Sequence, residues 1–305
     1  MVTQRRINAR VTSTKGFETE YPFAPHYLNL NGHLLHYLDE GTGPPVLMVH
    51  GNPTWSFYFR HLVPRLSVRF RTLVPDHIGC GFSDKPAPEK YDYTLASRVA
   101  DLDAFLSITV PEGKLDFIVH DWGGMIGLAW ALDHPDRINK VVITNTAGFF
   151  LPKEKRFPWM LWALKYLNWF AVPAVLGLNL FSVGALYLGA CTRLPVQVKK
   201  GLTAPYNSWK NRIATLKFVQ DIPLTPADPA WKVVNQVDKK IHRLNPEQVM
   251  FLWGAKDFVF DTCFLDEFLT RLPGARSHVF EDAGHYLFED KPEETARHIH
   301  RFLVS

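Results

Sequence analysis

An aspartate at a sharp strand-to-helix turn is the residue in this sequence best suited to covalent chemistry. Asp121 follows an apolar run with β-branched members at residues 117–119. Two glycines, Gly123 and Gly124, open the segment after it. This pattern is typical of a nucleophile elbow, which presents a side chain above a sheet and needs small residues for close packing. The competing interpretation is an ordinary βα turn that happens to carry an acid, so other residues must decide.

Two more polar residues could complete the machinery for such a nucleophile. Asp257 follows the apolar run at residues 249–253, and His285 follows the last predicted strand. The chain order of nucleophile, acid and histidine is the order found in α/β-hydrolase sheets. The acid would hold the imidazole in one tautomer and stabilise its charged form. We therefore predict a catalytic triad of Asp121, Asp257 and His285.

The type of nucleophile indicates the type of reaction. A serine that attacked a saturated carbon would form an ether, which a neighbouring base could not hydrolyse. An aspartate that attacks a saturated carbon forms an ester, whose carbonyl stays open to water activated by a histidine. Asp121 therefore argues against ordinary ester or peptide hydrolysis. It favours displacement at an alkyl carbon that bears a leaving group.

Two residues could bind the departing anion and form the oxyanion hole. The indole N–H of Trp122 is a donor only, and Asn52 supplies an amide from another loop. Their backbone N–H groups would stabilise an oxyanion during ester hydrolysis. The competing interpretations are a packed core aromatic for Trp122 and a simple turn residue before Pro53 for Asn52.

The segments around these residues alternate between strand and helix patterns, which predicts a mostly parallel sheet flanked by helices. Asn31-Gly32 between the first two strands predicts a hairpin turn. His50, Asp121 and Asp257 each follow the end of a strand, where ligands of such sheets bind. The predicted strands are residues 26–31, 33–39, 46–49, 71–74, 117–119, 138–144, 248–253 and 277–280. The predicted helices are 55–66, 95–108, 124–132, 263–272 and 292–303, of which 95–108 and 124–132 have amphipathic patterns.

The alternation breaks between residues 148 and 221, where the composition is helical and no strand is predicted. We predict an α/β-hydrolase core of residues 1–148 and 222–305 with an inserted helical cap of residues 149–221. No charged residue lies between Lys165 and Arg193, but several polar residues and Pro173 interrupt this apolar run, which argues against a membrane span.

The apolar run in the cap leaves its role open. It predicts two or three buried cap helices. A sharper hypothesis is that the cap lines a channel for long alkyl chains, or docks to a membrane or to a partner enzyme. The charged run at residues 153–156 would suit an anionic surface, or is simply solvated.

Composition excludes several other classes of protein. The 305 residues carry a formal net charge of +4 with scattered basic residues, so no nucleic-acid partner is expected. Three cysteines without a C-x-x-C spacing indicate neither a disulfide framework nor a thiolate metal site, and we expect no metal and no cofactor. Residues 1–17 are basic and lack an apolar run, so we expect a disordered arm rather than a secretory signal. A cytoplasmic location is expected, with peripheral membrane association as an open alternative.

Long motifs in the chain resemble those of haloalkane dehalogenases. The residues that carry the resemblance are those at 50–55, 75–86, 120–124 and 284–285, and it covers nearly the whole chain from about Tyr21. With Asp257 as the acid and Asn52 and Trp122 as halide donors, the chain looks like the third dehalogenase subfamily. Segments 205–209 and 212–224 resemble that subfamily's relatives, the β-lactone decarboxylases of bacterial long-chain olefin synthesis.

Two neighbouring families fit less well. Fluoroacetate dehalogenases place an arginine where Trp122 stands, and epoxide hydrolases use paired cap tyrosines. This cap contains Tyr166, Tyr187 and Tyr206, but Asn52 and Trp122 suit an anion rather than an epoxide oxygen.

The resemblance implies conversion of cis-3-alkyl-4-alkyloxetan-2-ones to cis-alkenes and CO₂. The alternative that it leaves open is hydrolysis of haloalkanes to alcohol and halide through a covalent ester. In either case the expected substrate is a small hydrophobic molecule. Other olefin-pathway enzymes, a membrane surface and a second copy of the chain are the further partners considered. A non-catalytic assembly subunit is disfavoured by the intact set of polar residues.

Overall fold

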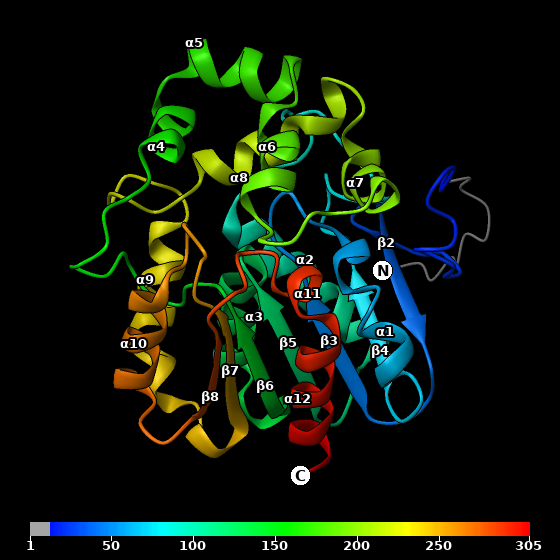
Figure 1. The fold of residues 1–305 in the computed structure, drawn as a ribbon, viewed down its shortest axis with the longest axis vertical. Coiled ribbons are helices and arrows are strands. Elements are labelled where there is room, and N and C mark those ends of the chain that lie inside the picture. The colour runs from blue at the N-terminus through cyan, green and yellow to red at the C-terminus, as the bar shows by residue number, and fades with distance from the viewer. Residues whose placement is uncertain (1–12) are drawn as a thin grey trace.

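The computed structural model describes residues 13–305 and is built around one eight-stranded sheet. The strand order is β1-β2-β4-β3-β5-β6-β7-β8 (Figure 1). β1 and β2 pair antiparallel, as do β2 and β4, and the remaining pairs are parallel. The predicted α/β fold with a mostly parallel sheet is confirmed. The strands are β1 His26–Leu30, β2 His33–Glu40, β3 Pro45–Val49, β4 Arg71–Pro75, β5 Leu115–His120, β6 Ile138–Thr144, β7 Val249–Gly254 and β8 Arg276–Phe280.

Helices cover both faces of the sheet, as the alternating pattern predicts. Side chains of β3 alternate between the two sides, since Leu47 and Val49 join one apolar cluster while Val46 and Met48 join the other. The first cluster also contains residues of α2 (Leu95–Thr109), α3 (Trp122–Asp133), α9 (Trp231–Lys240) and α10 (Thr262–Arg271). The second contains residues of α1 (Val63–Leu66), α11 (Leu287–Asp290) and α12 (Pro292–Val304).

The turn predicted at Asn31-Gly32 is present, but the helix predicted over residues 55–66 is not continuous. Asn31 and Gly32 have φ angles of 52° and 90°, the left-handed values that a tight hairpin turn needs. Residues 55–66 instead form a 3₁₀ turn (η1, Ser56–Phe59) and the short helix α1. Pro64 lies in the first turn of α1, where its missing N–H is tolerated, so the second helix starts there afresh.

The helix after the elbow differs from its predicted amphipathic character. In α3 every residue from Trp122 to Leu132 is buried. The helix is enclosed because it packs on the strands on one side and against α2 and α9 on the others. α9 and α11 are absent from the predicted elements. α9 buries only Val234 and Val237, so its apolar stripe is narrow.

The cap helices lie over the carboxyl ends of the central strands (Figure 1). They are α4 (Trp159–Tyr166), α5 (Asn168–Ala171), the π-helical turn η3 (Val172–Gly177), α6 (Leu180–Leu188), α7 (Val196–Thr203) and α8 (Ile213–Gln220). The expectation of buried cap helices is wrong for one face, since Trp159, Trp169 and Tyr187 are 76%, 78% and 66% exposed. The domain limits at residues 149 and 221 stay a prediction.

Within residues 13–305 no single helix is long and apolar enough to cross a membrane. The pair Asn168–Gly177 and Leu180–Leu188 passes that test together by length and composition, but it is bent by 78°.

The expected N-terminal arm, residues 1–17, falls largely outside the described residues. Its last residue, Phe17, is buried and packs edge-on against Trp55 and Phe57. The arm expectation is therefore wrong at Phe17, because an aromatic cluster on the core holds that side chain.

Candidate active site

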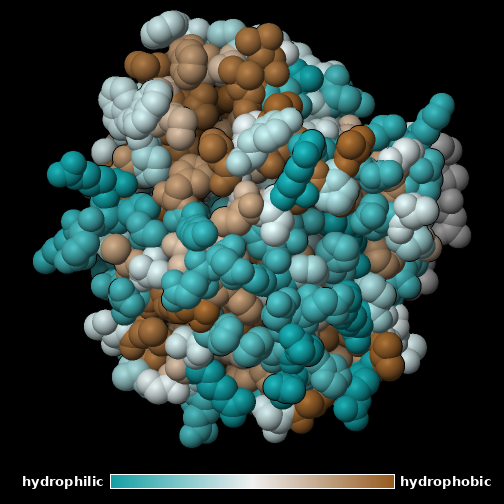
Figure 2. All heavy atoms as spheres, in the orientation of Figure 1, coloured by the Kyte–Doolittle hydropathy of each residue, from teal (hydrophilic) through white to brown (hydrophobic). Residues whose placement is uncertain are grey.

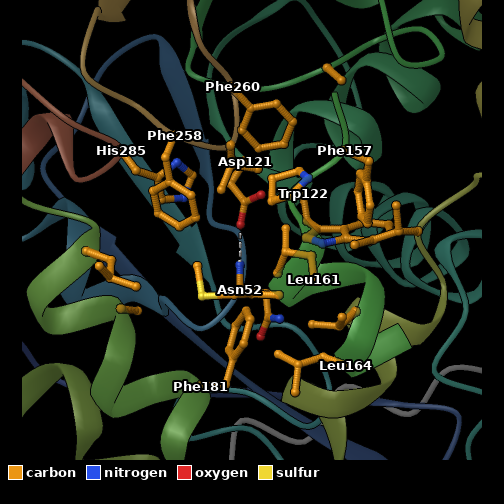
Figure 3. Close-up of a pocket in the computed structure, with 18 of the residues that line it drawn as sticks. Asn52, Asp121, Trp122, Phe157, Leu161, Leu164, Phe181, Phe258, Phe260 and His285 are labelled. Carbon is orange, nitrogen blue, oxygen red and sulfur yellow. Dashed lines mark hydrogen bonds between the residues drawn. The ribbon is translucent and has the colours of Figure 1, made fainter. Parts of the chain in front are cut away.

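The elbow between β5 and α3 presents Asp121 in a strained conformation. Its φ and ψ are 51° and −130°, a region that non-glycine residues rarely adopt. A Cβ on Gly123 would collide with the backbone carbonyl of Val49, so only glycine lets α3 approach β3 this closely. The turn is therefore locally strained, and it places the Asp121 carboxylate at the floor of a cavity (Figure 3).

The Asp121 carboxylate is buried, and neighbouring groups compensate part of its negative charge. One oxygen, Oδ2, accepts a hydrogen bond of 2.7 Å from the backbone N–H of Asn52. Burial raises the pKa of Asp121 from 3.8 to about 6, and the positive charge of His285 and the N–H groups of Asn52 and Trp122 offset part of that rise. The group is ionised at neutral pH beneath an apolar cavity, and a poorly solvated carboxylate is strongly nucleophilic.

His285 and Asp257 meet beside this carboxylate. The Nδ1 atom of His285 lies 2.7 Å from Oδ2 of Asp257, so the acid engages this ring nitrogen and not Nε2. Oδ1 of Asp257 accepts hydrogen bonds from the backbone N–H groups of Val259 and Phe260, at 2.7 and 3.1 Å. Burial lowers the pKa of His285, but Asp257 and the charge of Asp121 outweigh it, so the pKa is raised overall. The structure thus brings the three predicted triad residues together.

The two predicted anion donors are differently placed. Trp122 is buried with its ring 5.2 Å from that of Phe218, and its indole N–H has no acceptor among residues 13–305. The Asn52 side-chain amide instead donates to the backbone carbonyl of Thr215 in α8, at 3.0 Å. One amide hydrogen of Asn52 is therefore committed to the cap, and only the other is left for an anion.

The cavity above the nucleophile is almost entirely apolar. Its volume is about 350 Å³, and among residues 13–305 the polar side chains that line it, apart from indole N–H groups, are Asn52, Asp121 and His285. None of the three cap tyrosines lines it: Tyr206 is buried and donates to the carbonyl of Thr54. The paired tyrosines of an epoxide hydrolase are thus absent from this lining. Apolar members of the wall include Phe157, Leu161, Leu164, Phe181, Phe258 and Phe260 (Figure 3). Met125 also lines the cavity.

Two residues after β6 position the site and are missing from the sequence-based prediction. The Asn145 side chain donates to the carbonyls of Gly254 and Phe260, at 3.1 and 3.3 Å, and accepts from the N–H of Gly254 at 2.8 Å. The hydroxyl of Thr146 donates to the carbonyl of Asp121. Asn145 thereby ties the strand that ends beside the elbow to the loop that carries Asp257. The sequence signal that could have identified Asn145 and Thr146 is their position as polar residues directly after a predicted strand.

Two histidines that border the site stay uncharged. Burial holds the pKa of His77 and of His120 well below the usual value. His120 Nε2 lies 2.8 Å from the carbonyl of His285, so it supports the backbone there. Among residues 13–305 no group of three or more His, Cys, Asp or Glu side chains is arranged to hold a metal ion.

Comparison with known proteins identifies the family. A family model for the α/β-hydrolase fold matches residues 44–292. The chain belongs to the α/β-hydrolase family. A solved haloalkane dehalogenase from Bradyrhizobium elkani shares this fold with a TM-score of 0.82 at 21% identity, over 92% of this α/β-hydrolase and 98% of that chain.

Curated relatives of this α/β-hydrolase cover nearly its whole length. Two are named cis-3-alkyl-4-alkyloxetan-2-one decarboxylase. The one from Shewanella oneidensis is 44% identical over 94% of this chain and 90% of its own, and the one from Xanthomonas campestris is 46% identical over 93% and 97%. A haloalkane dehalogenase from Mycolicibacterium paratuberculosis is 30% identical over 92% of both chains. The resemblance drawn from the motifs, to haloalkane dehalogenases and more closely to β-lactone decarboxylases, is confirmed.

Proposed function

We propose that this α/β-hydrolase is a cis-3-alkyl-4-alkyloxetan-2-one decarboxylase, which converts a long-chain β-lactone to a cis-alkene and CO₂. The observation that carries the proposal is an ionised aspartate at the floor of a cavity whose wall is otherwise almost wholly apolar. Such a site suits a substrate with two alkyl arms and one compact polar ring. Relatives with this name at 44% and 46% identity support it over the dehalogenase alternative, whose curated example is 30% identical.

The first step is displacement at the saturated ring carbon that is bonded to the ring oxygen, not at the carbonyl carbon. A carboxylate oxygen of Asp121 forms a bond to this carbon while its bond to the ring oxygen breaks with inversion. The electron pair of the broken bond stays on the ring oxygen. This oxygen and the former lactone carbonyl then form a carboxylate, which is attached to the ring carbon next to the one attacked. The indole N–H of Trp122 and the second amide hydrogen of Asn52 are the donors available to that anion.

The second step releases both products without water. The bond between the neighbouring carbon and the new carboxylate breaks, and its electrons form the alkene. The ester bond to Asp121 breaks at the same time, which returns the carboxylate and liberates CO₂. Inversion followed by anti elimination converts a cis-lactone to a cis-alkene. No proton is transferred in either step.

His285 and Asp257 stabilise charge in this scheme rather than move protons. A protonated His285 held by Asp257 favours the Asp121 carboxylate that departs in the second step. In the alternative function, hydrolysis of a haloalkane, the same imidazole must act as a base on water. The displacement step already removes the charge of Asp121, which lowers the pKa of His285 and prepares it as that base.

The deciding experiment supplies a synthetic cis-dialkyl-β-lactone and measures alkene and CO₂ by gas chromatography. The wild-type chain is expected to form the cis-alkene, and Asp121→Ala to form none. Halide release from 1-bromohexane or 1,2-dibromoethane is measured in parallel. A higher kcat/KM for a haloalkane than for the lactone would make the dehalogenase function the better one.

We further propose that the chain works in the cytoplasm at a membrane surface. Other enzymes of olefin synthesis and a second copy of the chain are the alternative partners. The exposed apolar face of the cap supports an association of this kind.

A further inference from the structure

The cap carries an apolar face that is open to solvent and continuous with the cavity. Its most exposed members are Trp159, Trp169, Leu178, Tyr187 and Leu188, each more than half exposed. Figure 2 shows brown and white spheres gathered over the cap, whereas teal dominates most of the view below it. Large exposed apolar patches mark interaction surfaces. We call this surface, made by α4, α5, η3 and α6, the cap face.

The cap face is also the outer wall of the substrate cavity. Trp159, Met160 and Leu188 are exposed to solvent and line the cavity as well. Phe170 and Leu180 share both properties. Whatever covers the cap face therefore lies against the outer wall of the cavity.

The charge of the cap is opposite to that of the rest of the chain. Residues 149–221 contain ten Lys and Arg but only two acids, Glu154 and Asp221, which gives this segment a net charge of +8. The whole chain has a net charge of +4, so the remainder carries −4. Lys155 and Lys165 pair with Asp261 and Asp228 outside this segment. Arg156 and Lys210 are exposed; Arg156 lies three residues before the exposed Trp159, and Lys210 directly follows the exposed Trp209.

We propose that the cap face binds the surface of an anionic phospholipid bilayer. Tryptophan and tyrosine favour the headgroup level of a membrane, and basic residues are attracted to anionic lipids. The combination of these residues with aliphatic ones is typical of a peripheral membrane surface. A second copy of the chain fits less well, because two caps that each carry a surplus of basic residues repel each other.

This contact gives the cavity a direct exchange with lipid. A long-chain lactone and a long-chain alkene both partition into a bilayer, so they can pass between it and the cavity without entering water. That consequence rests on the proposed function, whereas the binding of the bilayer does not.

The test is flotation of the full chain with vesicles of phosphatidylcholine alone or mixed with phosphatidylglycerol. We expect the chain to float with the anionic vesicles and to bind the neutral ones at least tenfold more weakly. The test variant is Trp162→Ser combined with Trp169→Ser, because these two exposed residues do not line the cavity. It should bind anionic vesicles at least tenfold more weakly. The matched control is Val68→Ser, which removes a side chain that is 79% exposed outside the cap and should bind like the wild type.

Two further measurements keep the outcome clear. Thermal unfolding and turnover of a short, water-soluble lactone should be the same in all three proteins. Absence of vesicle binding, or equal binding by the tryptophan variant, would overturn the proposal. Light scattering that showed a dimer abolished by the same substitutions, without vesicle binding, would assign the cap face to a second copy. Vesicle binding without lactone turnover would refute the proposed function and leave the membrane surface standing.

Discussion

At the scale of single residues, the ester formed on Asp121 is the point at which the two candidate reactions diverge. A β-lactone brings its own carboxylate next to the ester, so elimination can release the enzyme. A haloalkane brings no such group, so only water activated by His285 can release it. The same three side chains thus support both reactions, but they do not carry equal weight in each.

Substitution of His285 should separate the two reactions. In His285→Gln we expect haloalkane turnover to fall by a factor of about 100 or more, the usual contribution of a general base. Lactone turnover should fall by less than about tenfold, since no proton is transferred. Halide release in a single burst, with a stable alkyl adduct on Asp121 by mass spectrometry, would show the arrested ester. Equal losses for both substrates would contradict the water-free second step.

The pH dependence of lactone turnover should report the ionisation of Asp121. Its pKa is raised to about 6, and only the carboxylate attacks, so kcat/KM should fall tenfold per pH unit below about pH 6. The charge of His285 lowers this pKa, so in His285→Gln the acid limb should move to higher pH. A limb that stays in place in the variant would show that another group titrates.

The buried charge of Asp121 should also make the fold less stable. Because the folded pKa of about 6 lies above the ordinary 3.8, the penalty is absent below pH 3.8 and complete above about pH 6. Such a rise corresponds to about 3 kcal/mol. Asp121→Asn should therefore raise the melting temperature by several degrees at pH 8 and leave it nearly unchanged at pH 4. An equal gain at both pH values would assign the effect to something other than the charge.

At the scale of elements, the site depends on how closely α3 approaches β3. Gly123→Ala would place a methyl group against the Val49 carbonyl, and backbone on both sides prevents relief. We expect a loss of more than about 3 kcal/mol in the free energy of unfolding, measured in urea. The matched control is Gly184→Ala in α6, because a Cβ added there would have no neighbouring atom within 4 Å. In this control the better helix propensity of alanine should raise the free energy of unfolding by as much as about 1 kcal/mol. Similar losses in both variants would contradict the close approach.

The sequence pattern predicts elements best where one local signal is enough. The central strands, the elbow and the loops after strand ends follow from short apolar runs that end in polar residues. The enclosure of α3 does not, because burial on its outer side comes from α9, more than ninety residues further along the chain. The bond from Asn52 to Thr215 escapes prediction for the same reason, since it joins a core loop to a cap helix.

At the scale of the whole molecule, the cap and the core divide the work. The core supplies polar groups on a rigid sheet, and the cap supplies an apolar wall. The common location of Asp121, Asp257 and His285 could be predicted, because the carboxyl ends of parallel strands lie at the same edge of a sheet. The exposure of the cap could not be predicted, since an apolar helix reads the same whether it faces protein, lipid or water.

The distribution of tryptophans gives the molecule an optical property. The chain has nine tryptophans, and the four that are exposed, Trp159, Trp162, Trp169 and Trp209, all belong to the cap. Indoles in water emit at longer wavelengths than indoles in an apolar interior, so the red edge of the intrinsic fluorescence comes from the cap and the blue edge from the core. Iodide should quench the red edge selectively. An unlabelled sample therefore reports in real time, by its own colour of emission, when the cap leaves water.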